Sequence, residues 1–372
     1  MINTQNREHY LDNLRWIAML LGVFVHTSKL DNFGFLDQIA EVSNLFRMAL
    51  FFLISGYLGA LLLSKKSNLD FLKSRLANLT IPLAAGILIL NPITFLLMHQ
   101  YIDGNPSFDR AISVYSLNEE QRFKDIIIVW HLHLWFLFSL IFYVLMATLI
   151  KDIIKKTSSK VQSYILDRPA VLRNIHAITI SFIIITSIFT IIIFKCIESF
   201  TGNLPWIIRI TFQYIPFYIT GMIIFYCKTL FINLRKTNYV LGFIIIFTYI
   251  IFNHMYTQNS TLSLITLICA RTWICFFMLD LGYKFLNIKN KATTLLSESI
   301  YTVYIFHFIV IYILATLLTK PFEMNILDYV TISVITISIC IMAHIYLIKK
   351  SNLALLVFNG RLKKAKETSI IN

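Results

Sequence analysis

The chain has 372 residues, of which 57% are hydrophobic and only 14% are charged. Soluble domains contain about 45–50% apolar and about 25% charged residues, so this composition excludes a water-soluble globule. The net charge of +14 does not indicate nucleic-acid binding, because the lysines fall in alternating loops rather than along one stripe. The five cysteines lie in or beside apolar runs and form no C-x-x-C pair, so we expect neither a disulfide framework nor a metal site.

Apolar runs of near-spanning length recur from one end of the chain to the other. They predict an all-α fold, a polytopic transmembrane helix bundle of about ten spans. The expected spans are 14–31, 44–63, 79–99, 130–150, 177–196, 206–227, 239–254, 261–283, 299–319 and 327–348. The first is expected to be retained rather than cleaved as a signal peptide, since no small-residue cleavage pattern follows it. The seventh is short for a hydrocarbon core of about 30 Å.

Lysine and arginine are concentrated in every second loop, which predicts that these loops face the cytoplasm. The loops 64–78 and 151–176 are the clearest cases, and the second is interpreted as a polar connector. An even number of spans then places both termini in the cytoplasm. We therefore expect one transmembrane domain over residues 1–350, followed by a basic cytoplasmic tail, 351–372.

The stretch RWIAMLLGVFVH contains Arg15 and His26 inside a segment that otherwise has the character of a membrane helix. The two residues are eleven positions apart. That spacing comes within roughly 20° of three helical turns, so both side chains share one face, about 16 Å apart along the axis. An ionisable residue in a membrane usually faces a polar cavity that serves function. The alternative is that Arg15 snorkels at a membrane edge and His26 packs in a hydrogen-bonded bundle.

Further polar residues lie within the predicted spans. Ser55 and Gly56 are at mid-span, where small residues let either a packing helix or a substrate approach the backbone. Trp130 and Trp135 fit an interfacial aromatic belt, and His133 between them is a candidate to point inward. Arg271 lies deep in its span with no partner on the same helix, so it needs a carboxylate, a group of carbonyls or an anionic ligand. His307 continues a stripe of tyrosines that forms either a polar seam or ordinary packing.

Two segments carry a resemblance to a known family. The opening YLDNLRWIAMLLGVFVHTS resembles the arginine, ten residues, histidine signature of the acyltransferase-3 family of bacterial integral-membrane O-acyltransferases, with Arg15 and His26 at its ends. The segment MALFFLISGYLGALLL is similar to that family's Phe-Phe-x-x-Ser-Gly-aromatic span, with Ser55 and Gly56. Residues 10–13, just before the first expected span, look most like those of the branch that includes a glucan-succinylating membrane protein.

The resemblance extends over nearly the whole chain. Weaker matches are HLWFL at 133–137 and SIYTVYIFHFIVIY at 299–312. The run FLKSRLANLTIP departs from the family, because it has Lys73 and Arg75 but Asn78 where a second arginine is common.

The resemblance implies an enzyme, an acyltransferase that transfers groups other than aminoacyl groups, in the bacterial cytoplasmic (inner) membrane as a multi-pass protein. It would move an acetyl- or succinyl-class acyl group from cytoplasmic acyl-CoA to a hydroxyl of an envelope glycan or lipid-linked sugar. Acyl-CoA is then a co-substrate and no cofactor is bound permanently. The other expected partners are the glycan or glycolipid acceptor and membrane lipids, and not nucleic acid.

The chemistry of that reaction assigns expected roles. An alcohol is a weak nucleophile, and an imidazole that titrates near neutrality can take its proton, so His26 is the expected general base. Arg15 would hold an anionic part of the donor. Ser55 is a candidate donor to the oxyanion of the tetrahedral intermediate. Basic cytoplasmic loops would attract the coenzyme's phosphates. The candidate substrate-binding residues are Ser55, Arg271, His133, His307, Arg75 and Lys73.

A transporter or flippase of a glycan or lipid-linked precursor is the alternative function. Proton-coupled carriers also contain intramembrane histidine and arginine residues. Against this alternative, the sequence has no visible inverted repeat and no pair of Gly/Pro-broken helices.

Overall fold

The computed structural model describes residues 8–31, 34–114, 121–123, 126–168, 175–200, 206–234, 236, 238–255, 261–319 and 323–361. The chain divides into two compact units, each made of three segments. Unit 1 comprises Met1–Val25, Gly34–Leu72 and Phe142–Ser297, and unit 2 comprises His26–Phe33, Lys73–Ile141 and Glu298–Asn372.

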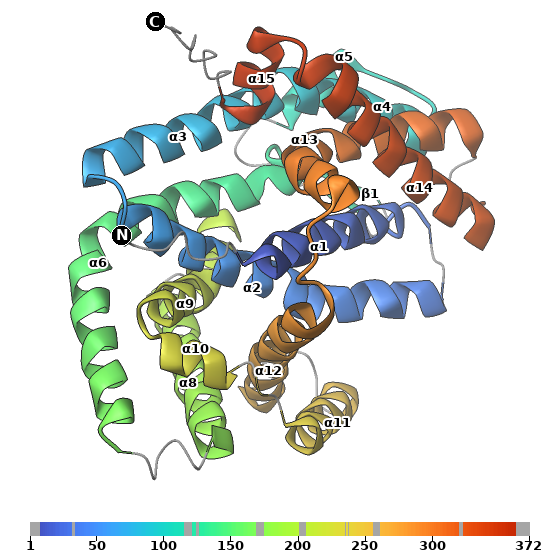
Figure 1. The fold of residues 1–372 in the computed structure, drawn as a ribbon. Helices are drawn as coiled ribbons and strands as arrows, with labels where there is room; N and C mark the ends of the chain where they lie inside the picture. Colours follow the sequence, from blue (N-terminus) through green and yellow to red (C-terminus); the bar gives the residue numbers. More distant parts are fainter. Residues whose placement is uncertain are drawn as a thin grey trace, which may run out of the picture. The chain divides into compact units, whose positions relative to one another are not determined.

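Helices form nearly all of the described structure, which confirms the predicted all-α class (Figure 1). In chain order they are α1 (His9–Thr27), α2 (Phe35–Leu63), α3 (Asn68–Ala85), the π-helical turn η1 (Gly86–Leu90), α4 (Asn91–Asp103), α5 (Phe108–Ser113), the 3₁₀ turn η2 (Leu132–Leu134), α6 (Trp135–Leu166), α8 (Ile175–Phe200), α9 (Trp206–Tyr226), α10 (Lys228–Leu234), α11 (Tyr239–Met255), α12 (Thr261–Phe285), α13 (Lys291–Leu318), α14 (Ile326–Ala343), the π-helical turn η3 (His344–Ile348) and α15 (Asn352–Asn359). A short antiparallel pair, β1 (Gln121–Phe123) and β2 (Ile126–Ile128), is the exception.

Eight helices in the described ranges are long and apolar enough to cross a membrane. Helices satisfy every backbone group internally, which is the condition for crossing lipid. The expected first and seventh spans are helical as α1 and α11, but they are not among these eight. The multi-pass architecture is therefore supported, while the count of ten and the cytoplasmic termini stay predictions.

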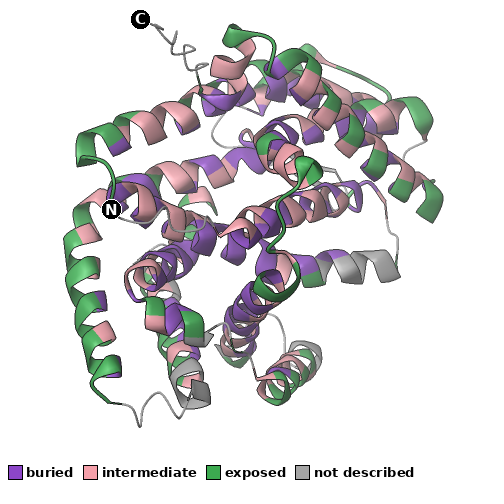
Figure 2. Cartoon of the chain, in the orientation of Figure 1, coloured by how far each residue is buried: buried purple, intermediate pink, exposed green. Residues whose placement is uncertain are grey.

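Two expected loops are largely helical. The loop expected at 64–78 contains the start of α3, so Lys73 and Arg75 lie on a helix, with Lys73 exposed and Arg75 half-buried. The connector expected at 151–176 is helical through Leu166 as the second half of α6, and most of that half is exposed (Figure 2). Lysine and glutamine favour helix as well as loop, so polarity alone does not mark where a membrane helix ends.

Unit 1 is organised around α2, which packs against α9 and α12. α8 covers both α9 and α12, and α11 packs on α12. Glycines allow the α2–α9 approach. A Cβ built on Gly56 would lie 2.0 Å from the Tyr218 carbonyl oxygen, and one built on Gly221 would lie 1.9 Å from the Leu53 carbonyl oxygen. Of the two interpretations of the Ser55-Gly56 pair, the structure therefore supports helix packing for the glycine.

Unit 2 joins α14 and α15 through the turn η3. The Thr302 hydroxyl lies 2.8 Å from His344 Nδ1 and donates to Asn359 Oδ1 at 3.3 Å, which connects α13 to both elements. Tyr301 donates to the Asn78 carbonyl oxygen at 3.0 Å and so connects α13 to α3. The helix α15 is the described part of the expected tail, of which residues 362–372 lie outside the described ranges.

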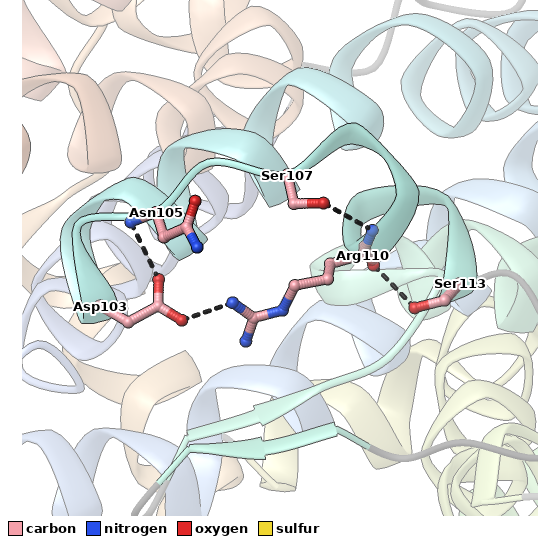
Figure 3. Close-up of polar contacts among 5 residues, drawn as sticks. All are labelled: Asp103, Asn105, Ser107, Arg110 and Ser113. Carbon is pink, nitrogen blue, oxygen red and sulfur yellow. Dashed lines mark hydrogen bonds and ion pairs between the residues drawn. The ribbon is translucent and has the colours of Figure 1, made fainter.

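Contacts of Arg110 stabilise the connection between α4 and α5 (Figure 3). Its guanidinium lies 2.6 Å from Asp103 Oδ2, and the Ser107 hydroxyl caps α5 by accepting from the Arg110 amide at 3.4 Å. Both members of the ion pair are about a third exposed, so the pair contributes at most about 1 kcal/mol. Residues 115–120 and 124–125, which lie between α5 and η2 in the sequence, are outside the described ranges.

Candidate active site

Three histidines that are distant in sequence meet within unit 2. The ring centroids of His26 and His307 are 5.2 Å apart, those of His133 and His307 are 4.7 Å apart, and those of His26 and His133 are 6.3 Å apart. His133 and His307 are 7% and 2% exposed, whereas His26 is half-buried. We call these three residues the histidine cluster.

His26 occupies the last turn of α1. The end of a helix carries partial negative charge from its unsatisfied carbonyls, which stabilises an imidazolium formed there. The chain then turns, with the Lys29 amide donating to the His26 carbonyl oxygen at 3.3 Å. Asp31 Oδ2 accepts from the Met324 amide at 2.8 Å and fixes this segment to the approach of α14. Because α1 contains both Arg15 and His26, the expected separation of about three turns holds.

His133 lies on the tight 3₁₀ turn η2, just before α6. Leu132 in this turn has φ 45°, a left-handed conformation that costs a non-glycine residue about 1–2 kcal/mol. The turn is held by Asn91, which donates to the Trp130 carbonyl oxygen at 2.8 Å, and by the Leu134 amide, which donates to the His131 carbonyl oxygen at 2.8 Å. Strained backbone of this kind gathers at functional sites, where surrounding structure maintains it.

The π-helical turn η1 also contacts the segment that carries His133. A Cβ built on Gly86 would lie 2.7 Å from Leu134 Cδ1, so the missing side chain makes room for this leucine. π-helical turns inside α-helices are frequent at functional sites.

His307 has a defined tautomer because of its place on α13. Its Nδ1 lies 3.0 Å from the Val303 carbonyl oxygen and 2.9 Å from the Tyr304 carbonyl oxygen. Carbonyl oxygens only accept, so Nδ1 carries the proton and Nε2 carries the lone pair. A backbone hydrogen bond of this kind sets which ring nitrogen is available as a base.

Aromatic rings line the histidine cluster. The Phe308 ring stacks on His133 at 4.9 Å and contacts His26 edge-on at 4.9 Å. Tyr304 donates from its hydroxyl to the His133 carbonyl oxygen at 2.9 Å. Within the part of the chain that the structure describes, neither ring nitrogen of His133 has a hydrogen-bond partner. No group of His, Cys, Asp or Glu among the described residues is arranged to hold a metal ion. The arrangement suits proton transfer in a site of low water content.

Replacing Tyr304 with Phe tests how the histidine cluster is positioned. We expect acyl-transfer kcat to fall several-fold with little change in KM, because the buried His133 carbonyl loses its donor and the turn loosens. Steady-state kinetics on the purified variant measure this. The matched control is Tyr301→Phe, whose hydroxyl donates to Asn78 instead. Equal kcat losses in both variants would show that Tyr304 acts only on general stability.

The other predicted site residues are divided between the two units, with Lys73 and Arg75 in unit 2. Arg15 is half-buried in unit 1 and lies 3.8 Å from Asp12 Oδ1 on the same helix. Ser55, on α2, is half-buried, and Arg271, on α12, is buried; both belong to unit 1. The structure thus brings together His26, His133 and His307 among the predicted residues. The roles assigned to the eight residues stay predictions.

Sequence reasoning placed Tyr304 in the tyrosine stripe that His307 continues but assigned it no role in a site. It missed Phe308 as part of the cluster and Arg47 as a buried cation. Tyr304 lies three residues before His307 and Phe308 directly follows it, so helical spacing contained a signal for the tyrosine only. Arg47 is 7% exposed on α2, and its signal was a charge near the start of an apolar run.

Comparison with known proteins adds independent information on ancestry. The family described as an acyltransferase domain, acyltransferase-3, matches residues 8–345. Glucans biosynthesis protein C of Escherichia coli O17:K52:H18 is 25% identical over 328 residues, covering 81% of each chain. The protein of the same name from E. coli K12 is likewise 25% identical over 328 residues, and that from E. coli O81 is 24% identical, again with 81% of each chain covered. No solved structure gave a significant match.

The family match includes all three members of the histidine cluster and both ends of the Arg15–His26 signature. It agrees with the apolar helices of the structure. The chain is therefore a membrane acyltransferase that transfers groups other than aminoacyl groups, and it belongs to the acyltransferase-3 family.

Proposed function

We propose that the protein transfers an acetyl- or succinyl-class acyl group from cytoplasmic acyl-CoA to a hydroxyl of an envelope glycan or lipid-linked sugar in the bacterial inner membrane. The single observation that supports the proposed general-base chemistry is the histidine cluster, in which the half-buried His26 lies beside two buried imidazoles. The acceptor class is supported by the relatives, whose name assigns them to the biosynthesis of glucans.

In the proposed reaction, His26 takes the proton of the acceptor hydroxyl as its oxygen attacks the thioester carbonyl. A C–O bond forms, and the tetrahedral intermediate then expels the coenzyme's sulfur as the C–S bond breaks. The proton held by His26 passes to the leaving thiolate, so charge and atoms balance. The family's use of the arginine–histidine pair supports His26 rather than its neighbours as the base.

The two buried histidines support His26 in this proposal. His307 has a fixed tautomer and a centroid 5.2 Å from His26, so it orients the neighbouring imidazole or passes the proton onward. The Phe308 ring covers both His26 and His133, which limits water access and thereby hydrolysis of the thioester. On α3, Lys73 and Arg75 are the proposed contacts for the coenzyme's phosphates.

The test is acyl transfer by the purified full-length protein in detergent. Acetyl-CoA and succinyl-CoA, labelled in the acyl group, are supplied separately with envelope glucans as acceptors. The expected result is label in the glycan as an alkali-labile ester, without any membrane gradient. Acceptor movement in proteoliposomes that depends on a gradient and occurs without ester formation would contradict the proposal and favour the carrier function. Ester formation from an acyl donor other than acyl-CoA would overturn the donor assignment.

A further inference from the structure

Two arginines of unit 1 are buried and form no ion pair with any side chain that the structure describes. Arg47 on α2 and Arg271 on α12 are 7% and 8% exposed. Among the carboxylates whose side chains the structure describes, none lies within ion-pair distance of either guanidinium. Both residues lie within helices that are long and apolar enough to cross a membrane.

Hydrogen bonds satisfy only part of each guanidinium. Arg47 donates from Nη2 to Asn44 Oδ1 at 3.1 Å, and Arg271 donates from Nε to the Leu45 carbonyl oxygen at 3.2 Å. Arg47 Nε, Arg47 Nη1 and Arg271 Nη1 are buried without any partner. Buried donors of this kind are rare in folded proteins, since each loses its bonds to water and gains none.

The two side chains approach the same turn of α2. Arg271 reaches the backbone of Leu45, two residues before Arg47, and its guanidinium lies over the Tyr214 ring at 5.3 Å. Gly22 on α1 leaves space for the Arg47 guanidinium, because a Cβ built on this glycine would lie 3.0 Å from Arg47 Nη1. The packing of α2 against α9 and α12 holds these groups in place.

A buried cation opposes folding unless an anion compensates its charge. A charge buried without a compensating partner is strongly destabilising, whereas replacing buried ionic groups by apolar residues of similar volume is often neutral or stabilising. A guanidinium presents its donors in a planar fork that matches the two oxygens of a carboxylate or phosphate. The Tyr214 ring makes a cation–π contact with the Arg271 guanidinium, which helps to hold it in position.

From this arrangement we propose that Arg47 and Arg271 form an oxyanion-binding site in unit 1, which takes the carboxylate or phosphate group of a ligand. Arg47 Nη1 and Nε and Arg271 Nη1 are its donors. Its occupant is either a soluble oxyanion or the phosphate of a lipid headgroup, which share this chemistry.

The test measures the melting temperature of the purified full-length protein. In neutral detergent, sodium phosphate and sodium acetate are titrated against sodium chloride at equal ionic strength. In parallel, nanodiscs of phosphatidylcholine are compared with nanodiscs that also contain phosphatidylglycerol. A ligand that binds only the folded state raises the melting temperature. A rise in detergent identifies a soluble oxyanion, and a rise only with phosphatidylglycerol identifies a lipid phosphate.

Arg47→Gln and Arg271→Gln are each expected to weaken the apparent affinity for the effective oxyanion at least about tenfold. In the absence of the anion, both variants should melt at or above the temperature of the wild type, because a buried unpaired charge has been removed. A purely structural role for the arginines predicts a lower melting temperature instead. Arg47→Lys keeps the charge but loses the planar fork, so its affinity should lie between those of the wild type and Arg47→Gln.

The matched control is Arg209→Gln, because Arg209 belongs to the same unit and is exposed on α9. It should respond to anions as the wild type does. The proposal is overturned if neither an oxyanion in detergent nor phosphatidylglycerol in nanodiscs raises the melting temperature above its control. It is also overturned if the rise persists in both buried-arginine variants, or if Arg209→Gln loses the rise as well. None of these measurements requires acyl transfer, so such a failure would leave the proposed catalytic function untouched.

Discussion

His26→Gln is expected to lower the kcat of acyl transfer by about a hundredfold to ten-thousandfold, the range over which a positioned general base contributes. Glutamine has a similar size and retains hydrogen-bonding groups, but it has no nitrogen that accepts a proton near neutral pH. KM for the acyl donor should change little, since the base acts on the acceptor hydroxyl only as the bond forms. Initial rates with labelled acyl-CoA at saturating acceptor measure the effect.

His9→Gln is the matched control for this variant, because His9 lies on the first turn of the same helix, α1. It should keep the activity of the wild type. Circular dichroism and gel filtration in detergent check that both variants are folded. A His26→Gln protein that is folded and fully active would refute the assignment of His26 as the base. The histidine cluster would then act through His307, whose Nε2 carries a lone pair.

The sequence was sufficient to predict the helical class and the first member of the cluster. Apolar runs located the helices, since backbone groups within lipid require internal hydrogen bonds. The Arg15–His26 spacing was meaningful because both residues lie on one helix, so a local rule sufficed. Helix ends were predicted less well. Lys73 marked an expected loop, yet it lies on α3, because the polar segment 68–78 forms the first turns of the helix that the apolar run continues.

His133 and His307 were single polar residues with two interpretations each, and only the tertiary structure shows that they lie together. His133 lies on a 3₁₀ turn in which Leu132 has a positive φ, so helical spacing rules did not apply to it. The two rings approach to 4.7 Å although the residues are 174 positions apart, a contact that no local pattern specifies. Arg47 was missed for a related reason, since only burial distinguishes it from an arginine that snorkels to a membrane surface.

Gly56→Ala is expected to destabilise the protein by about 3 kcal/mol or more, at the upper end of the range for overpacked cores. The new Cβ would lie 2.0 Å from the Tyr218 carbonyl oxygen, so α2 and α9 must move apart. Backbone cannot rotate away as a side chain does, and small residues are what allow membrane helices to pack this closely. Alanine also favours helix over glycine by about 1 kcal/mol, so any measured loss must come from the contact.

Gly59→Ala is the matched control on the same helix. Its Cβ would meet the Tyr218 hydroxyl at 2.7 Å, at the far end of a side chain, so a smaller loss is expected. Gly221→Ala, 1.9 Å from the Leu53 carbonyl oxygen, should match Gly56→Ala. The double variant should lose less than the sum of the two, because the first clash has already separated the helices. Unfolding of the purified proteins by heat or by SDS measures all four. Equal stability of Gly56→Ala and Gly59→Ala would contradict the close crossing of α2 and α9, and would return the Ser55-Gly56 pair to the interpretation in which a substrate approaches the backbone.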